Sequence, residues 1–487
     1  MIFNLNEVQF DGVTTVVKYA IYISIIALTI AGLFQYEGSL YVYLIFSIVS
    51  NALLYFGFRK NAIFFDTFIG IFFWLGFWLK FSVRICFLDG QFREAVGNFD
   101  GSAVAFDQAL LVTSCGLMGL LVASFVREKF IFRYPEKFKK SPQDSVLNFY
   151  NEYRKFILVG FVVLFMSVAL TNVIFEIYQR GEIAKTELPW GLNGIYKWLL
   201  LFGLASVSAM ILKYEILAKN SVSYTVVMIS LLESFATNVS LLSRGMILNV
   251  SALVYGIYSS SKIESVKISH RFLITTFLIF TTLFASSVFV VNYIRSPDTK
   301  KLGQSQNQSL RVSEASSMAK PLLLDRWVGI EGVMAVSSSP RLGWELWQSA
   351  WKEKYSENTI SFYDQNLIVS PYLDDDFTVV HFISLPGILA FCFYPGSFAF
   401  LFGCMFLLGL FAVFIEMSAY KLAGNNLILC SLIAEVVAFR FASFGYVPAQ
   451  SYLLFGSIFL NLIIIYALYK FINYWDTRRS NKIAVTQ

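Results

Sequence analysis

The sequence predicts an all-α polytopic membrane protein with about twelve transmembrane helices. Of its 487 residues, 57% are hydrophobic and only 14% are charged, and the mean hydropathy is +0.63. A single water-soluble domain cannot cover so much apolar surface with polar residues. The apolar residues are also gathered into runs of about 20, the length at which a helix spans the hydrocarbon core of a bilayer. These observations exclude a water-soluble globular protein.

Twelve apolar runs are long enough to be predicted as membrane spans. Each is expected to be a helix because, within hydrocarbon, every backbone amide must find its partner inside its own segment. The runs lie at residues 16–34, 39–57, 61–79, 104–126, 156–175, 195–212, 221–241, 246–260, 272–292, 396–416, 426–444 and 451–470.

Basic residues predict how the spans are oriented. Lys and Arg resist translocation, so the loops that carry them are expected in the cytoplasm. Arg59 and Lys60 follow the second run, and a basic stretch from Arg127 to Lys155 separates the fourth run from the fifth. The same alternation places the tail with Arg479 in the cytoplasm, so both termini are expected there. The net charge of +6 follows from this asymmetry, and nucleic acid is not an expected partner.

The predicted spans divide the chain into three parts. Residues 1–292 hold transmembrane helices 1–9, residues 293–380 form a long, partly helical periplasmic segment, and residues 381–487 hold a half-helix, helices 10–12 and a cytoplasmic tail. The half-helix, or re-entrant entry, is predicted from Pro386-Gly387 and Pro395-Gly396, which interrupt the chain before the tenth span.

Three tryptophans in the periplasmic segment are spaced by three and four residues, which predicts a helix with one aromatic face. We expect this helix to lie on the membrane surface, with a platform for stacking sugars as the alternative. The three residues are Trp344, Trp347 and Trp351.

Four arginines are candidates for binding an anionic ligand. A guanidinium binds phosphate oxygens through two parallel hydrogen bonds and is always charged, so several together would suit a diphosphate. Arg244 lies in a connection too short to be a solvated loop, and a cation there is unfavourable without an anionic partner. Arg326 and Arg341 flank an apolar stretch, and Arg440 lies inside the eleventh run. A structural alternative for Arg244 is that it closes a tight turn, with its side chain either extended to the membrane surface or paired with an acid.

Three residues are candidates for removing a proton. Glu331 and Asp325 lie in the apolar sequence LLLDRWVGIEGVMAV, and a carboxylate in apolar surroundings has a raised pKa that suits proton removal from a hydroxyl group. His381 lies where the long segment re-enters the membrane. The alternatives are an ordinary ion pair between Asp325 and Arg326 that folds the segment, and an interfacial location for His381 without a chemical role.

Three motifs occur in a characteristic layout along the chain. SRG at Ser243 to Gly245 forms a turn between two mid-chain helices, DRWVGIEG at Asp325 to Gly332 lies in the long late segment, and SLPG with YPG lies between Ser384 and Gly396. Together with the order of the spans, they resemble the O-antigen polymerase (Wzy) family of polysaccharide polymerases.

The resemblance implies an inverting, metal-independent glycosyltransferase of the GT-C type in the bacterial inner membrane. Such an enzyme joins undecaprenyl-diphosphate-linked oligosaccharide repeat units of O-antigen or a related surface polysaccharide at the periplasmic face, and releases undecaprenyl diphosphate. Because the donor is already activated, the lack of a glycine-rich phosphate loop in the sequence fits this chemistry. No metal or cofactor is expected. The expected partners are the lipid-linked oligosaccharide and membrane lipids, and a polysaccharide chain-length regulator is a candidate.

The resemblance also suggests a role for each candidate residue. Arg244, Arg326 and Arg341, with Arg440 in reserve, would stabilise the charge on the departing diphosphate. Glu331 and Asp325, ahead of His381, would take the proton of the acceptor hydroxyl. Two aromatic residues, Trp327 and Tyr363, would stack on sugars or pack in the core.

Two other functions remain open from the sequence. A lipid-linked oligosaccharide flippase would also have about twelve spans, although transporters of this kind usually have short loops and internal repeats. An O-antigen ligase would share the layout and chemistry of the polymerase and differ in its acceptor.

Overall fold

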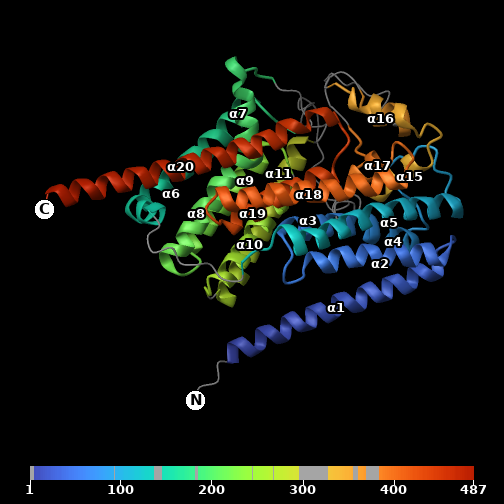
Figure 1. Ribbon diagram of the computed structural model, residues 1–487, viewed down its shortest axis with the longest axis horizontal. Coiled ribbons are helices and arrows are strands. Elements are labelled where there is room, and N and C mark those ends of the chain that lie inside the picture. The colour runs from blue at the N-terminus through green and yellow to red at the C-terminus, as the bar shows by residue number, and fades with distance from the viewer. Residues whose placement is uncertain are drawn as a thin grey trace, which may run out of the picture.

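The computed structural model describes residues 5–92, 94–135, 145–180, 185–243, 245–266, 268–295, 327–354, 360–368 and 383–486. Every regular element within these residues is a helix (Figure 1), as expected for an all-α protein. The α-helices are α1 (Leu5–Gln35), α2 (Leu40–Gly57), α3 (Phe64–Phe73), α4 (Lys80–Phe87), α5 (Ala103–Val126), α6 (Ser145–Phe175), α7 (Leu192–Trp198), α8 (Leu204–Lys219), α9 (Tyr224–Ser240), α10 (Met246–Ile263), α11 (His270–Arg295), α15 (Ile330–Ser337), α16 (Trp344–Trp351), α17 (Ile388–Cys392), α18 (Phe398–Leu422), α19 (Leu427–Ala442) and α20 (Ser451–Thr486).

Six short helical segments of other types extend or join these helices. Four are π-helical turns, which insert an extra residue into the helical repeat: η1 (Trp74–Leu79), η2 (Arg127–Ile131), η4 (Leu199–Gly203) and η5 (Asp364–Ile368). Two are 3₁₀ turns, η3 (Pro189–Gly191) and η7 (Pro448–Gln450). Because η1 joins α3 to α4 without a break, these three elements form one membrane-length helix.

Eight helical segments of the described chain are long and apolar enough to cross a membrane, which makes this a multi-pass membrane protein. They are Leu40–Gly57, Phe64–Phe87, Ala103–Ile131, Ser145–Phe175, Pro189–Lys219, Arg271–Ile294, Phe398–Leu422 and Pro448–Arg479. The other four predicted runs fall on α1, α9, α10 and α19, which are not among these eight. The total of twelve spans therefore stays a prediction.

The two ends of the bundle differ in what they hold. Helix α1 begins and α20 finishes on one side of the molecule, whereas α15, α16 and α17 lie at the other (Figure 1). We call these the tail end and the α15 end. The orientation of the two termini relative to a membrane stays a prediction.

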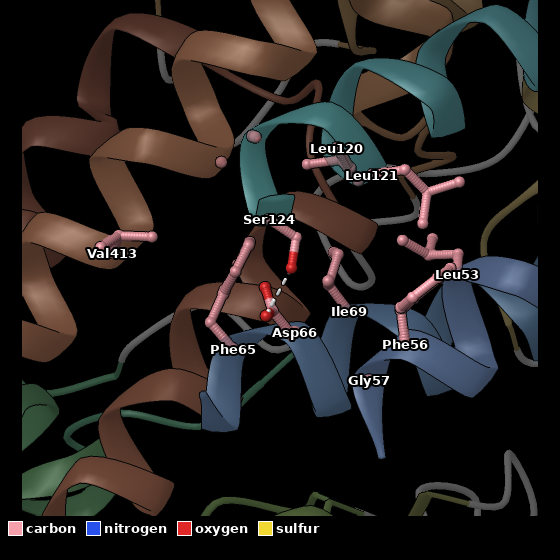
Figure 2. A pocket seen from close by; sticks show the side chains of 12 residues that line it. Leu53, Phe56, Gly57, Phe65, Asp66, Ile69, Leu120, Leu121, Ser124 and Val413 are labelled. Carbon is pink, nitrogen blue, oxygen red and sulfur yellow. Dashed lines mark hydrogen bonds between the residues drawn. The ribbon is translucent and has the colours of Figure 1, made fainter. Parts of the chain in front are cut away.

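A polar network holds helices together towards the tail end. The Ser124 hydroxyl donates to Asp66 Oδ2 at 2.6 Å, and Arg127 forms an ion pair with the same carboxylate. A cavity of about 10 Å³ lies beside Asp66, between apolar side chains of α2, α3, α5 and α18 (Figure 2). That volume holds about one water molecule, so this cavity is too small for an oligosaccharide.

At the α15 end, part of the long segment is inserted among the helices. All eight residues of α15 are buried, and its backbone approaches its neighbours closely: a Cβ at Gly329 would lie 2.1 Å from the Gly76 carbonyl oxygen, and one at Gly332 would lie 2.0 Å from the Pro386 carbonyl oxygen. Glycines at these positions permit helix-to-backbone contact without a side chain between. The inserted segment is thus packed into the bundle.

The predicted short helices of this region are present. Helix α17, between the two Pro-Gly pairs, is five residues long and fully buried, as expected for a half-helix. Helix α16 carries the three tryptophans. Trp344 and Trp347 contact Phe400 of α18, with ring centroids 4.9 and 5.1 Å apart. Part of the aromatic face therefore packs on protein, and its contact with the membrane surface stays a prediction.

Candidate functional site

The structure describes five of the nine predicted site residues. Four lie outside the described residues: Arg244, Asp325, Arg326 and His381. The other five all belong to the α15 end or to the part of α19 that approaches it. They are Trp327, Glu331, Arg341, Tyr363 and Arg440.

Glu331 forms a buried ion pair with Lys80. The Lys80 Nζ atom lies 2.9 Å from Glu331 Oε1 and 3.0 Å from Oε2, and it also donates to the Trp327 carbonyl oxygen at 2.7 Å. Only 1% of Lys80 and 4% of Glu331 are exposed. Burial raises the pKa of Glu331, and the Lys80 charge opposes that rise. The pair joins the first turn of α15 to α4 and fixes the backbone that precedes α15.

Three aromatic rings connect this ion pair to α19. The Trp327 ring stacks on Phe72 of α3, with centroids 5.9 Å apart and an interplanar angle of 25°. Phe72 in turn makes an edge contact with Phe439 of α19 at 5.8 Å. We call these three rings the aromatic wall, and Trp327, at one end of it, is partly buried.

A second buried carboxylate lies on the other side of the aromatic wall. Ser431, Glu435 and Phe439 are spaced by four residues and so lie on one face of α19. Ser431 donates to the Ala252 carbonyl oxygen of α10 at 2.7 Å, and Phe439 contacts Phe72. Glu435 is therefore placed between α10 and α3, with 2% of its surface exposed.

The SRG turn lies above Glu435 at the start of α10. Helices α10 and α19 are antiparallel, because Gly256 lies against Ile428 and Ala252 lies against Ser431. Glu435 is one helical turn beyond Ser431, so it lies about one turn, roughly 5 Å, from the level of Gly245. The turn is thus next to the buried carboxylate.

Arg180 covers this turn. Its backbone N–H donates to the Leu241 carbonyl oxygen at 3.0 Å, and its Nη1 donates to the Ser243 hydroxyl at 3.3 Å. The Ser243 hydroxyl also accepts from the Gly245 N–H at 3.1 Å. Arg180 is exposed to solvent, and its charge acts on Glu435.

The remaining predicted residues have varied surroundings. Arg440 is partly buried, donates to the Ser451 hydroxyl at 3.1 Å and lies over the Phe444 ring, 5.5 Å from its centroid. Arg341 is exposed and donates to Asn366 Oδ1 at 3.2 Å. The Tyr363 ring is buried in the core, which favours the packing alternative for this residue over sugar stacking.

Three residues of this region were not predicted from the sequence as site residues: Lys80, Arg180 and Glu435. Lys80 directly follows the predicted run 61–79, and Glu435 lies inside the run 426–444. An ionisable residue at such a position is itself a signal of function. Arg180 lies in a polar loop and carries no such signal.

The described residues of this region combine cations, aromatic rings and a buried carboxylate, Glu435, that forms no ion pair with a described cation. These are the groups that a transfer from a phosphate leaving group to a hydroxyl requires. No protein-family model, curated protein or solved structure matches this chain.

Proposed function

We propose that this protein is a membrane glycosyltransferase that polymerises undecaprenyl-diphosphate-linked oligosaccharide units at the periplasmic face of the bacterial inner membrane. The observation that carries the proposal is the attachment of Arg180 to the Ser243–Gly245 turn. It holds one arginine against the connection between α9 and α10, whose sequence contains a second, Arg244. Two guanidinium groups suit the two phosphates of a diphosphate.

The chemistry of the leaving group explains why arginine is suited to this position. As the glycosidic bond to the diphosphate breaks, negative charge builds on the phosphate oxygens, and fixed cations stabilise that charge without reorganisation. The hydrogen bond to Ser243 holds Arg180 in place before the ligand arrives. Arg341 and Arg440 add positive charge at the same end of the molecule.

Substitution of Arg180 tests the proposal. Arg180→Gln removes the charge and should lower polymer formation by about 10- to 100-fold, the effect of losing a hydrogen bond to a charged group. Arg180→Lys keeps the charge but loses the planar fork, so an intermediate loss is expected. Polymer length and amount would be measured on the cell surface, together with the abundance of the protein.

Lys185→Gln is the matched control, because it removes a cation from the same connection. Lys185 is exposed and forms an ion pair with Glu176 at 2.6 Å. We expect this variant to polymerise as the wild type does. Wild-type polymer from Arg180→Gln at normal abundance would contradict the diphosphate site.

A second candidate function, flipping of the lipid-linked oligosaccharide, is favoured by one observation. Glu233 and Glu435 are carboxylates buried in the helices α9 and α19, and acids within membrane helices often form the proton relays of transporters. Purified protein in vesicles distinguishes the two functions. A flippase moves the lipid-linked substrate between leaflets without forming new glycosidic bonds, whereas a polymerase forms them.

A further inference from the structure

We propose that Glu435 is the general base that takes the proton from the acceptor hydroxyl group. The inference rests on the proposed glycosyltransferase function and assigns a catalytic residue within the same site. In the part of the chain that the structure describes, seven Asp and Glu side chains are buried: Asp66, Glu215, Glu233, Glu331, Asp364, Glu416 and Glu435.

Six of these seven acids have a structural partner that accounts for them. They accept hydrogen bonds from a hydroxyl group, a cation or a backbone N–H. Among them, Glu435 accepts no hydrogen bond from any residue that the structure describes, and the charge of Arg180 acts on it. A buried carboxylate without a hydrogen bond is unfavourable for folding, so a role in function is the better explanation for this residue.

The carboxylate oxygens of Glu435 are not fully enclosed, although only 2% of the residue is exposed. Glu233 Oε2 is enclosed with no partner, whereas neither carboxylate oxygen of Glu435 is enclosed in that way. The small exposed part of Glu435 therefore includes its oxygens. They lie about one helical turn below the SRG turn, where the diphosphate is proposed to bind.

Glu331 is less suited to this step than Glu435. The Lys80 ammonium lies within hydrogen-bond distance of both Glu331 oxygens. Protonation of Glu331 would break this buried ion pair, which is strongly unfavourable. Glu435 has no ion pair with any cation that the structure describes, so its protonation breaks no such pair. A carboxylate in that setting accepts a proton more readily.

The reaction balances with no further reactant. The acceptor hydroxyl oxygen attacks the anomeric carbon of the donor sugar, and its proton passes to a Glu435 oxygen. The bond between the anomeric carbon and the diphosphate oxygen breaks, and its electron pair stays on the diphosphate, next to Arg180. Attack from the side opposite the leaving group inverts the anomeric configuration. Glu435 then returns the proton to water.

Glu435→Gln tests the assignment, because glutamine has the same shape and cannot accept the proton. Turnover of purified protein on undecaprenyl-diphosphate-linked repeat units should fall about 10²- to 10⁴-fold, the usual loss on removal of a general base. Binding of the lipid-linked oligosaccharide, measured separately, should change little. Glu233→Gln is the matched control, since it makes the same chemical change at another buried acid, and wild-type turnover is expected.

Rescue provides a second readout that a purely structural role would not give. In Glu435→Ala the side chain is removed, and added formate can enter the space and accept the proton. We expect formate to restore turnover of this variant in proportion to its concentration and to leave the wild type unchanged. Full turnover of Glu435→Gln, or a Glu435→Ala rate independent of formate, would overturn the assignment.

The outcomes separate this inference from the function on which it rests. If the wild type and Glu435→Gln both form polymer at the same rate, the base assignment is wrong and the proposed function stands. If the wild type forms no glycosidic bond under any condition, both are wrong. Loss of substrate binding together with turnover in Glu435→Gln would also contradict a base, because it would assign Glu435 to binding.

Discussion

Lys80 and Glu331 are separated by 251 residues in the chain, and yet the Nζ atom of one lies within 3.0 Å of both carboxylate oxygens of the other. The pair joins the helix α3–η1–α4 to the segment inserted at the α15 end. Lys80 also holds the Trp327 carbonyl oxygen. The position of the aromatic wall therefore depends on this ion pair.

Removal of Lys80 alone should destabilise the protein strongly. Lys80→Met leaves the Glu331 charge buried without a partner, and breaking a buried pair in this way costs about 3–5 kcal/mol. The free energy of unfolding in detergent should fall by that order. Replacing both residues, in Lys80→Met with Glu331→Leu, should recover most of the stability, because a matched apolar pair avoids the burial of charge.

The same double variant tests the prediction that Glu331 is the base. If Glu331 only positions the segment, the stable double variant should retain turnover of lipid-linked units. If Glu331 takes the proton, turnover should be lost although the protein remains folded. A single variant that unfolds no more easily than the wild type would contradict the ion pair itself.

Close packing of α15 predicts a size limit at Gly332. An added methyl group would lie 2.0 Å from the Pro386 carbonyl oxygen, so Gly332→Ala must displace the backbone. Overpacking of this kind typically costs about 1–3 kcal/mol. Thermal unfolding should show a lower midpoint for this variant. Gly343→Ala, in the same segment with open space around it, is the control and should leave the midpoint unchanged.

Glu416 is predicted to stabilise the start of α3. Its two carboxylate oxygens accept from the Phe64 and Phe65 N–H groups at 2.8 and 2.9 Å, and Oε1 also accepts from the Tyr134 hydroxyl. The first N–H groups of a helix have no partner within it. Glu416→Ala should therefore lower the free energy of unfolding by about 1–3 kcal/mol.

Tyr134→Phe provides the comparison for Glu416, because it removes one of the three hydrogen bonds and leaves the two backbone contacts. Its effect, measured by chemical unfolding, should be smaller than that of Glu416→Ala. Equal effects of the two variants would show that the backbone contacts of Glu416 add nothing to stability.

Much of the fold could be predicted from the sequence because a bilayer imposes a simple rule. Apolar runs of about 20 residues must be helical, and each predicted run does fall on a helix. The first and last residues of the helices were predicted less well where polar residues continue a helix. Helix α6 begins at Ser145 and α20 continues to Thr486, because outside hydrocarbon a helix does not need apolar side chains.

The candidate site could be predicted only in part, because its contacts join distant segments. Glu331 was recognised from its apolar surroundings, but its partner Lys80 belongs to another helix and no local pattern connects the two. Glu435 carried a readable signal as an acid inside an apolar run. Its proximity to the SRG turn depends on the antiparallel packing of α10 and α19, which the sequence does not encode locally.

The orientation in the membrane gives a prediction that any strain expressing the protein can test. Reporters fused after Lys60, Lys140 and Arg479 should read as cytoplasmic, and a reporter near Gln306 should read as periplasmic, since basic loops stay in the cytoplasm. A cytoplasmic signal at Gln306 would place the proposed site on the wrong side for its substrate.

The central claim, that this chain forms glycosidic bonds between lipid-linked units, is tested most directly by a reaction with purified components. The protein in detergent would be incubated with one defined undecaprenyl-diphosphate-linked repeat unit, and the products would be separated by length. The proposed function predicts oligomers of several units, release of one undecaprenyl diphosphate for each new bond, and inversion at the anomeric carbon. Recovery of single units alone from folded protein, with translocation of the same substrate in vesicles, would contradict it and favour a flippase.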